Sequence, residues 1–363
     1  MPTPTLDDLR RYAVARTLGP PTTLARAIAR FGFVQADPIR APARAQDLTL
    51  RHRVAGYVAG DLERRYARLD VHEDFFVNYG FMSGPHWALM HPRRQFAPWD
   101  AATRRRASAV LAFVAERGRA HPREVDAHFA HGSVTNYWGG SSNATTHLLD
   151  GMHYRGLLRV VRRDNGIRVY APHVHVAQTR HLAARRARID ALIDVIVRKY
   201  APLPALTLST LIRRLRYAVP QHREELGEAV ERAKARLGHA RVDGRDWYWP
   251  ADEDPRAAEH EARAAVRLLA PFDPIAWDRL RFELLWDWAY RFEAYTPAPK
   301  RKLGYYALPL IWRDRAIGWA NVAVEGGRLR PVFGYVDRKP ASDPLFKRAL
   351  EAELDAMRRF LAL

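Results

Sequence analysis

The chain has 363 residues, of which 48% are hydrophobic and 27% are charged, and it contains no cysteine. This composition is that of a globular protein with a large core, and it excludes disulfides and thiolate metal sites. Lys and Arg number 59 against 40 Asp and Glu, so the net charge is +19, and only six of the cations are lysine. The excess favours a polyanionic partner such as nucleic acid, although a GC-rich genome would also enrich arginine.

No apolar run approaches the length of a membrane span. The first residues, MPTPTLDDLRR, mix acidic and basic side chains, which is not typical of a signal peptide. Together with the lack of cysteine, these features predict a cytoplasmic protein that has no membrane association.

The N-terminal part of the chain begins with two predicted helices, LDDLRRYAVARTLG and TTLARAIARFGF. In the following FVQADPIR, Pro38 disfavours helix at the preceding residue, so an extended segment is expected. Gln35 and Asp37 then face the same side, because residues i and i+2 of an extended segment do so. Four arginines follow, Arg40, Arg44, Arg51 and Arg53. They form either a solvated helix face or a set of contacts to DNA phosphates.

Residues 103–172 predict three helices followed by a hairpin, which is the winged-helix plan of DNA-binding proteins. The helices are TRRRASAVLAFVAER, PREVDAHFA and SSNATTHLLDGMHYRG, and the hairpin LLRVVRRDNGIRVYAP turns at Asp164-Asn165-Gly166. Tyr137 and Trp138 precede the third helix and suit core packing better than base stacking. A looser copy over 183–250 ends in a hairpin with an Asp-Gly turn, and we interpret residues 1–60 as a degenerate third copy.

After about residue 262 the sequence is rich in aromatics, Pro and Gly, with turn signals at Arg313-Asp314 and Gly326-Gly327. This pattern predicts a small, curved antiparallel sheet, and SDPLFKRALEAELDAMRRFLAL predicts a final amphipathic helix. The expected fold class is α+β: tandem winged-helix motifs followed by a small C-terminal antiparallel β-barrel-like domain. We place the domains at 1–100, 101–180, 181–260 and 261–363.

Common catalytic motifs are missing from the sequence: it has no Gly-rich phosphate loop, no HExxH pair and no Gly-x-Ser-x-Gly elbow. His173-Val-His175 could be part of a metal site, but a third ligand is not evident and a strand surface is the better interpretation. We therefore expect no metal and no cofactor.

Two blocks of the sequence resemble bacterial winged-helix DNA glycosylases of the AlkZ/YcaQ type. The first is FGFVQADPIRAPARAQDLTLRHR and the second is LLAPFDPIAWDRLRFELLWDWAYRFEAYTPAPKRKLGYYALPL. The resemblance covers about residues 5 to 330 and implies tandem winged helices joined to a β-barrel. It also implies hydrolysis of the N-glycosidic bond of alkylated bases in double-stranded DNA, and in some members the unhooking of interstrand crosslinks.

Gln35 and Asp37 match the Gln-x-Asp form of the family's active-site motif, which the resemblance ties to the crosslink-unhooking branch. The chemistry agrees with these residue types. An alkylated purine is cationic and is therefore a good leaving group, and the sugar becomes oxocarbenium-like as the base departs. A carboxylate at Asp37 would stabilise that cation and activate water, and the Gln35 amide would hold the water. The expected phosphate contacts are Arg44, Arg51, Arg53, Lys300 and Arg301.

The sequence places no lysine near Gln35 and Asp37, so we expect no Schiff-base lyase step and a monofunctional enzyme. We also expect the protein to be nucleoid-associated and to act as a monomer. Two stretches depart from the family pattern. FFVNYGFMSGP lacks the family's histidine, with Phe81 among the residues that stand in, and Trp319-Ala320-Asn321 lacks an arginine and an acid. Two other functions stay open: a non-catalytic DNA-binding regulator or damage sensor and, with less support, an RNA-binding module.

Overall fold

The computed structural model of the chain describes residues 3–93, 98–135, 140–176, 181–339 and 341–363. Tyr137 and Trp138, considered above for base stacking, lie outside these ranges. The chain forms two compact units. The first comprises Met1–Leu62, Ile193–Ile212 and Val230–Leu363, and the second comprises Glu63–Leu192 and Arg213–Ala229. The four-domain division expected from the sequence stays a prediction.

The first unit begins with α1 (Leu6–Thr17) and α2 (Leu24–Phe31), the two helices predicted from the sequence. Each begins at a threonine, Thr5 or Thr23, whose side chain accepts a backbone N–H of the first turn. Next come the short strand β1 (Phe33–Gln35) and the helix α3 (Ala45–Leu50), in which every residue is buried. The predicted extended conformation at Gln35 is therefore confirmed, and it carries the chain out of the core toward Asp37.

The middle of the first unit is a three-stranded antiparallel sheet of order β8-β10-β9. Its turn has positive φ at Asp243 (48°) and Gly244 (73°), which confirms the predicted Asp-Gly hairpin. The strands of this region are β8 (Leu203–Pro204), β9 (Gly238–Val242) and β10 (Arg245–Trp249). Its helices α9 (Leu182–Tyr200), α10 (Ala205–Arg214) and α11 (Leu226–Arg236) belong to it only in part, since the rest of each is assigned to the second unit.

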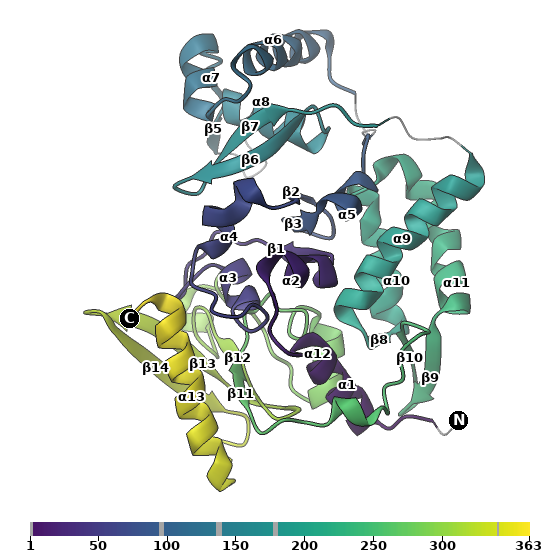
Figure 1. Cartoon of the computed structure of the whole chain (residues 1–363), viewed down its shortest axis with the longest axis vertical. Helices are drawn as coiled ribbons and strands as arrows, with labels where there is room; N and C mark the ends of the chain where they lie inside the picture. Colours follow the sequence, from purple (N-terminus) through teal and green to yellow (C-terminus); the bar gives the residue numbers. More distant parts are fainter. Residues whose placement is uncertain (1–2, 94–97, 136–139, 177–180, 340) are drawn as a thin grey trace. The chain divides into compact units, whose positions relative to one another are not determined.

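The C-terminal region of the first unit is a four-stranded antiparallel sheet of order β11-β12-β13-β14, with α13 lying against β11 (Figure 1). The turns fall at Arg313-Asp314 and Gly326-Gly327, as predicted. The expected β-barrel is wrong: within the described residues β11 and β14 are the open edges of this sheet, and no sheet closes. The elements are β11 (Val266–Leu268), α12 (Arg279–Trp286), β12 (Leu308–Trp312), β13 (Arg315–Glu325), β14 (Arg328–Tyr335) and α13 (Pro344–Leu361).

The second unit contains the three helices and the hairpin predicted over 103–172. They are α6 (Ala101–Arg117), α7 (Pro122–Phe129), α8 (Ala144–Tyr154) and the pair β6 (Leu158–Asp164) and β7 (Ile167–Pro172). The sequence did not predict its other elements, which are α4 (Asp61–Arg65), β2 (Val71–Phe75), β3 (Tyr79–Ser83), α5 (Gly84–Ala88), β4 (Ser133–Thr135) and β5 (Ser141–Asn143). The winged-helix identity of this unit stays a prediction.

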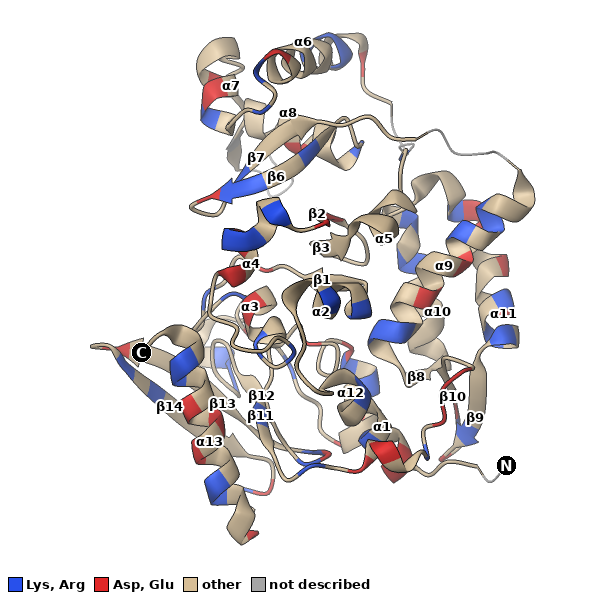
Figure 2. Ribbon diagram, in the orientation of Figure 1, with Lys and Arg blue, Asp and Glu red and all other residues tan. Residues whose placement is uncertain are grey.

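Basic residues occur on many elements of both units, among them α2, α4, β6, α10 and α11 (Figure 2). None of the helices in the described part of the chain is long and apolar enough to cross a bilayer.

Candidate active site

Asp37 lies at the point where the chain leaves the buried strand β1. Gln35 is 8% exposed, whereas Asp37 is half-buried and Pro38 is exposed. The backbone N–H of Asp37 donates to Oε1 of Gln46 (3.3 Å), which is 2% exposed in α3. The amide of Gln46 thus fixes the backbone at Asp37, a role that the sequence did not indicate because Gln46 stands in an ordinary helical segment.

The two oxygens of the Asp37 carboxylate differ in their hydrogen bonding. Oδ1 accepts the backbone N–H of Ile39 (2.9 Å), which forms the turn after β1, and Oδ2 makes no hydrogen bond within the described residues. Burial raises the pKa of Asp37, and the hydrogen bond from Ile39 opposes that rise only in part. The carboxylate therefore keeps one oxygen for a ligand and is a better proton acceptor than an exposed aspartate.

The charge of Asp37 acts on tyrosines, where the sequence led us to expect arginines. Within the described residues no cation forms an ion pair with Asp37, and no cation shifts its pKa. Its charge instead acts on two tyrosines: burial raises the pKa values of Tyr295 and Tyr306, and the Asp37 carboxylate raises both further. Residues 258 or more positions away in the chain thus complete the site, and sequence spacing could not identify them.

Two of the predicted phosphate contacts are structural. Arg53 is 4% exposed and its guanidinium binds the fully buried Asp273 through two contacts of 2.6 and 3.0 Å, while it also donates to Thr49 O and Thr17 O. Arg51 has a buried side chain that pairs with Glu353 and donates to Leu268 O (2.9 Å). The expectation that Arg51 and Arg53 contact DNA is therefore corrected, since both guanidinium groups are buried and already paired.

The other three predicted contacts are more accessible. Lys300 is exposed at the end of the short 3-10 helix Ala298–Lys300, and Arg44 is half-buried at the start of α3. Arg301 is half-buried, donates to Thr296 O (2.8 Å) and lies over the Tyr305 ring at 5.0 Å from its centroid. These three residues keep the predicted role as a proposal.

One lysine does lie beside the candidate site, which corrects the premise that none is near. Lys199 in α9 donates from Nζ to the backbone carbonyl of Phe33 (2.7 Å), two residues before Gln35. It is 2% exposed, and burial lowers its pKa well below the ordinary value. The amine donates to a carbonyl and so supports β1. The lowered pKa favours its neutral, nucleophilic form, but burial keeps that amine from a sugar carbon.

The two departures from the family pattern have structural roles here. Phe81 is fully buried in β3 of the second unit, with its ring 5.9 Å from that of Tyr66. Asn321 in β13 donates from Nδ2 to Leu303 O (2.7 Å) and so holds the chain just before Tyr305. His173 and His175 pack on Trp87, at ring-centroid distances of 4.7 and 5.0 Å, and the described residues contain no group of three or more acidic or histidine side chains arranged for a metal ion.

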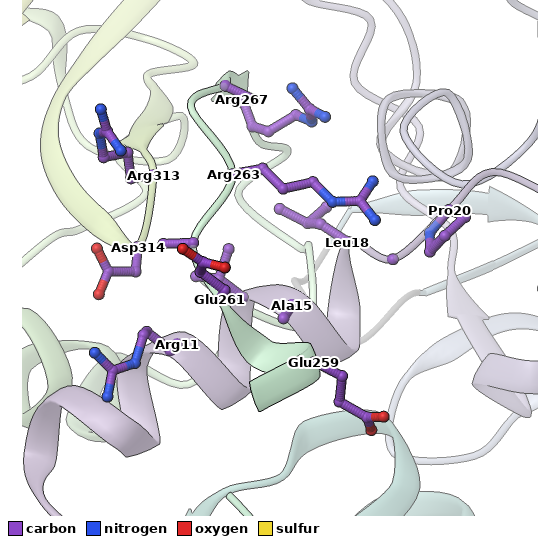
Figure 3. A pocket seen from close by; sticks show the side chains of 14 residues that line it. Arg11, Ala15, Leu18, Pro20, Glu259, Glu261, Arg263, Arg267, Arg313 and Asp314 are labelled. Carbon is purple, nitrogen blue, oxygen red and sulfur yellow. The ribbon is translucent and has the colours of Figure 1, made fainter. Parts of the chain in front are cut away.

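A pocket elsewhere in the first unit does not contain Gln35 or Asp37. It is lined by residues of α1 and of the segment before β11, with Arg11, Arg263 and Arg313 set among Glu261 and Asp314 (Figure 3). Because the two signs of charge alternate around this pocket, it has no strong preference for a polyanion.

Comparisons with known proteins agree with the resemblance seen in the sequence. The family model described as DNA glycosylase AlkZ-like matches residues 28–360. Among solved structures, the Streptomyces sahachiroi DNA glycosylase AlkZ is similar, with a TM-score of 0.64 and 15% sequence identity over 99% of this chain and 97% of that one. The structural match shows a shared fold, and the family match covers nearly the whole chain. The chain therefore belongs to the AlkZ-like DNA glycosylase family.

Proposed function

Proceeding from that membership, we propose that the protein is a monofunctional DNA glycosylase that removes alkylated purines from double-stranded DNA, including purines joined in interstrand crosslinks. Family membership supports DNA glycosylase activity in repair, and our proposal adds the identity of the lesion. The observation that carries the proposal is the half-buried Asp37, whose second oxygen has no partner in the described residues and whose charge no cation neutralises.

In the proposed reaction the glycosidic C–N bond breaks and its electron pair leaves with the base. A purine alkylated at N7 or N3 carries a positive charge, so it departs as a neutral molecule and needs no strong general acid. The sugar becomes oxocarbenium-like, and the Asp37 carboxylate stabilises its positive charge. Water forms the new C–O bond while its proton passes to Asp37, and the Gln35 amide orients that water.

The proposal is tested by incubating the protein with a duplex that contains one N7-methylguanine and then cleaving abasic sites with heat or base. We expect strand cleavage with the parent protein and with Glu224→Gln, an exposed carboxylate variant that serves as the matched control. Asp37→Asn should produce no cleavage above background while still binding the duplex. If the parent binds DNA and never releases the base, the non-catalytic DNA-binding function would be the better one.

A further inference from the structure

One loop of the first unit, residues 293–306, carries two exposed aromatic rings, and the charge of Asp37 acts on one of them, Tyr295. Among the described residues, Tyr217, Tyr295 and Tyr305 are the exposed aromatics, and two of these three belong to the segment 293–306. Tyr295 is 78% exposed and Tyr305 is 45% exposed, while their neighbour Tyr306 is buried at 2%. An exposed tyrosine presents an apolar π-face with a polar tip, so Tyr295, on which the charge of a candidate catalytic carboxylate acts, offers a stacking surface to a planar ligand.

The loop that presents these rings is held at both ends. The buried carboxylate of Glu293 accepts the backbone N–H groups of Lys302 (2.8 Å) and Leu303 (2.7 Å), which brings the two sides of the loop together. Arg301 donates to Thr296 O (2.8 Å), and its guanidinium lies over the Tyr305 ring.

The rings of this loop are also packed at their base. Phe292 contacts Tyr295 and Tyr306 edge-on, at centroid distances of 5.9 and 5.3 Å. Asn321 holds Leu303 through the hydrogen bond to its backbone carbonyl described above. The tyrosines are therefore presented in a fixed arrangement, and little conformational entropy would be lost when a ligand binds them.

We propose that Tyr295 forms the platform on which the damaged base rests as it leaves, and that this platform selects planar, cationic bases. The inference rests on the proposed function, which it deepens by naming the residue that discriminates among lesions. An alkylated purine presents a flat π-system with a positive charge, and a tyrosine ring attracts both. The Asp37 carboxylate, whose charge acts on Tyr295 and which has no cationic partner among the described residues, favours the same ligand over a neutral base.

The first experiment measures single-turnover base release from an N7-methylguanine duplex by Tyr295→Ala, Tyr295→Phe and Tyr295→Leu. Loss of a stacking ring is expected to slow release about 10- to 100-fold in Tyr295→Ala. Tyr295→Phe should stay close to the parent, and Tyr295→Leu, which keeps apolar bulk without a π-face, should resemble Tyr295→Ala. The matched control is Tyr217→Ala, an exposed tyrosine of the second unit. Parent-like rates in both Tyr295→Ala and Tyr295→Leu would overturn the platform.

A second experiment separates this inference from the proposed function, because it needs no catalysis. Equilibrium dialysis compares binding of the cationic nucleoside 7-methylguanosine with binding of neutral guanosine. The platform predicts a preference for 7-methylguanosine in the parent that is lost in Tyr295→Ala. If the parent shows that preference and cleaves no duplex, the platform stands and the proposed reaction fails. Equal binding of the two nucleosides, in a parent that does cleave, would overturn the platform alone.

Discussion

At the scale of single residues, Asp37 illustrates what a sequence can and cannot show. The Gln-x-Asp spacing and the family resemblance selected Gln35 and Asp37 as candidates, and the extended backbone predicted there is present at Gln35, the last residue of β1. The environment of the carboxylate was not predictable. Arg51 and Arg53, which follow it in sequence, pair with distant acids, and the charge of Asp37 acts instead on tyrosines from residues 295–306. The same distance in sequence hid Lys199, which contacts Phe33 from 166 positions away.

The raised pKa of Asp37 leads to a pH prediction. The carboxylate must be ionised to accept a proton from water, so the single-turnover rate should fall as the pH drops through the pKa of Asp37. Because burial raises that pKa above its ordinary value of 3.8, the midpoint of the acidic limb should lie above 3.8. The measurement is a pH–rate profile on an N7-methylguanine duplex, corrected for uncatalysed base loss. A midpoint at or below 3.8 would contradict this account of the site.

The same shift has a consequence for stability. A carboxyl whose pKa is higher in the folded chain than in the unfolded chain stabilises the fold at low pH, and that contribution is lost as the pH rises through the folded value. The ionised form of Asp37 therefore does not add to the stability of the fold, and a reason other than stability accounts for the residue. The substitution Asp37→Asn keeps an oxygen for the Ile39 N–H and removes the charge, so it should not weaken the fold, which makes it a suitable catalytic test.

At the scale of helices and strands, local signals predicted most of the elements. The three hairpins at Asp164-Asn165-Gly166, Asp243-Gly244 and Gly326-Gly327 are present because a glycine, with an Asn, an Asp or a second glycine before it, adopts the positive φ that such turns need. Closure of a sheet depends on pairing between its first and last strands, and no local signal reports that pairing. The open order β11-β12-β13-β14 therefore had to come from the structure.

The run after β11, which is part of the block that carried the family resemblance, mostly holds elements together. Asp273 pairs with Arg53, Asp278 caps α12 by accepting the backbone N–H of Arg281 (2.6 Å), and the hydroxyl of Tyr290 donates to Ala307 O (2.8 Å). A strong sequence signature thus identified the family, and its last part also carries Tyr295 and Tyr306, the tyrosines on which the charge of Asp37 acts.

Removing one partner of the Arg53–Asp273 pair is expected to destabilise the first unit strongly. Asp273→Asn leaves a buried guanidinium without its counter-charge, which typically costs about 3–5 kcal/mol. The half-exposed pair Arg313–Asp343 (3.1 Å) offers a matched control, since Asp343→Asn removes a partner that is screened by solvent and should cost less than about 1 kcal/mol. Urea unfolding followed by tryptophan fluorescence compares the two. Equal midpoints for Asp273→Asn and Asp343→Asn would show that the buried pair does not hold the unit.

At the scale of the whole molecule, basic residues occur on both units and the net charge is +19. Composition alone predicted a polyanionic partner, and membership in a DNA glycosylase family agrees with that prediction. What composition could not do is tell structural arginines from those that face a ligand. Arg51 and Arg53 are neutralised internally, so the DNA-facing charge must come from other residues, for which Arg44, Lys300 and Arg301 remain our proposal.

The three proposed phosphate contacts are tested by the salt dependence of DNA binding. Each of Arg44→Ala, Lys300→Ala and Arg301→Ala should weaken binding to any duplex and reduce the slope of log K against log salt by about one. Arg348→Ala, at an exposed position of α13, serves as the control. Slopes that match this control in all three variants would remove these residues from the DNA-binding surface.

The central claim, that the Asp37 carboxylate promotes loss of the base, is tested most directly by the single-turnover rate of 7-methylguanine release from a duplex saturated with protein. We predict that Asp37→Asn slows this step by about 100-fold or more, the usual contribution of a positioned acid–base group, with the dissociation constant for the duplex unchanged. A variant that is as fast as the parent would contradict the account.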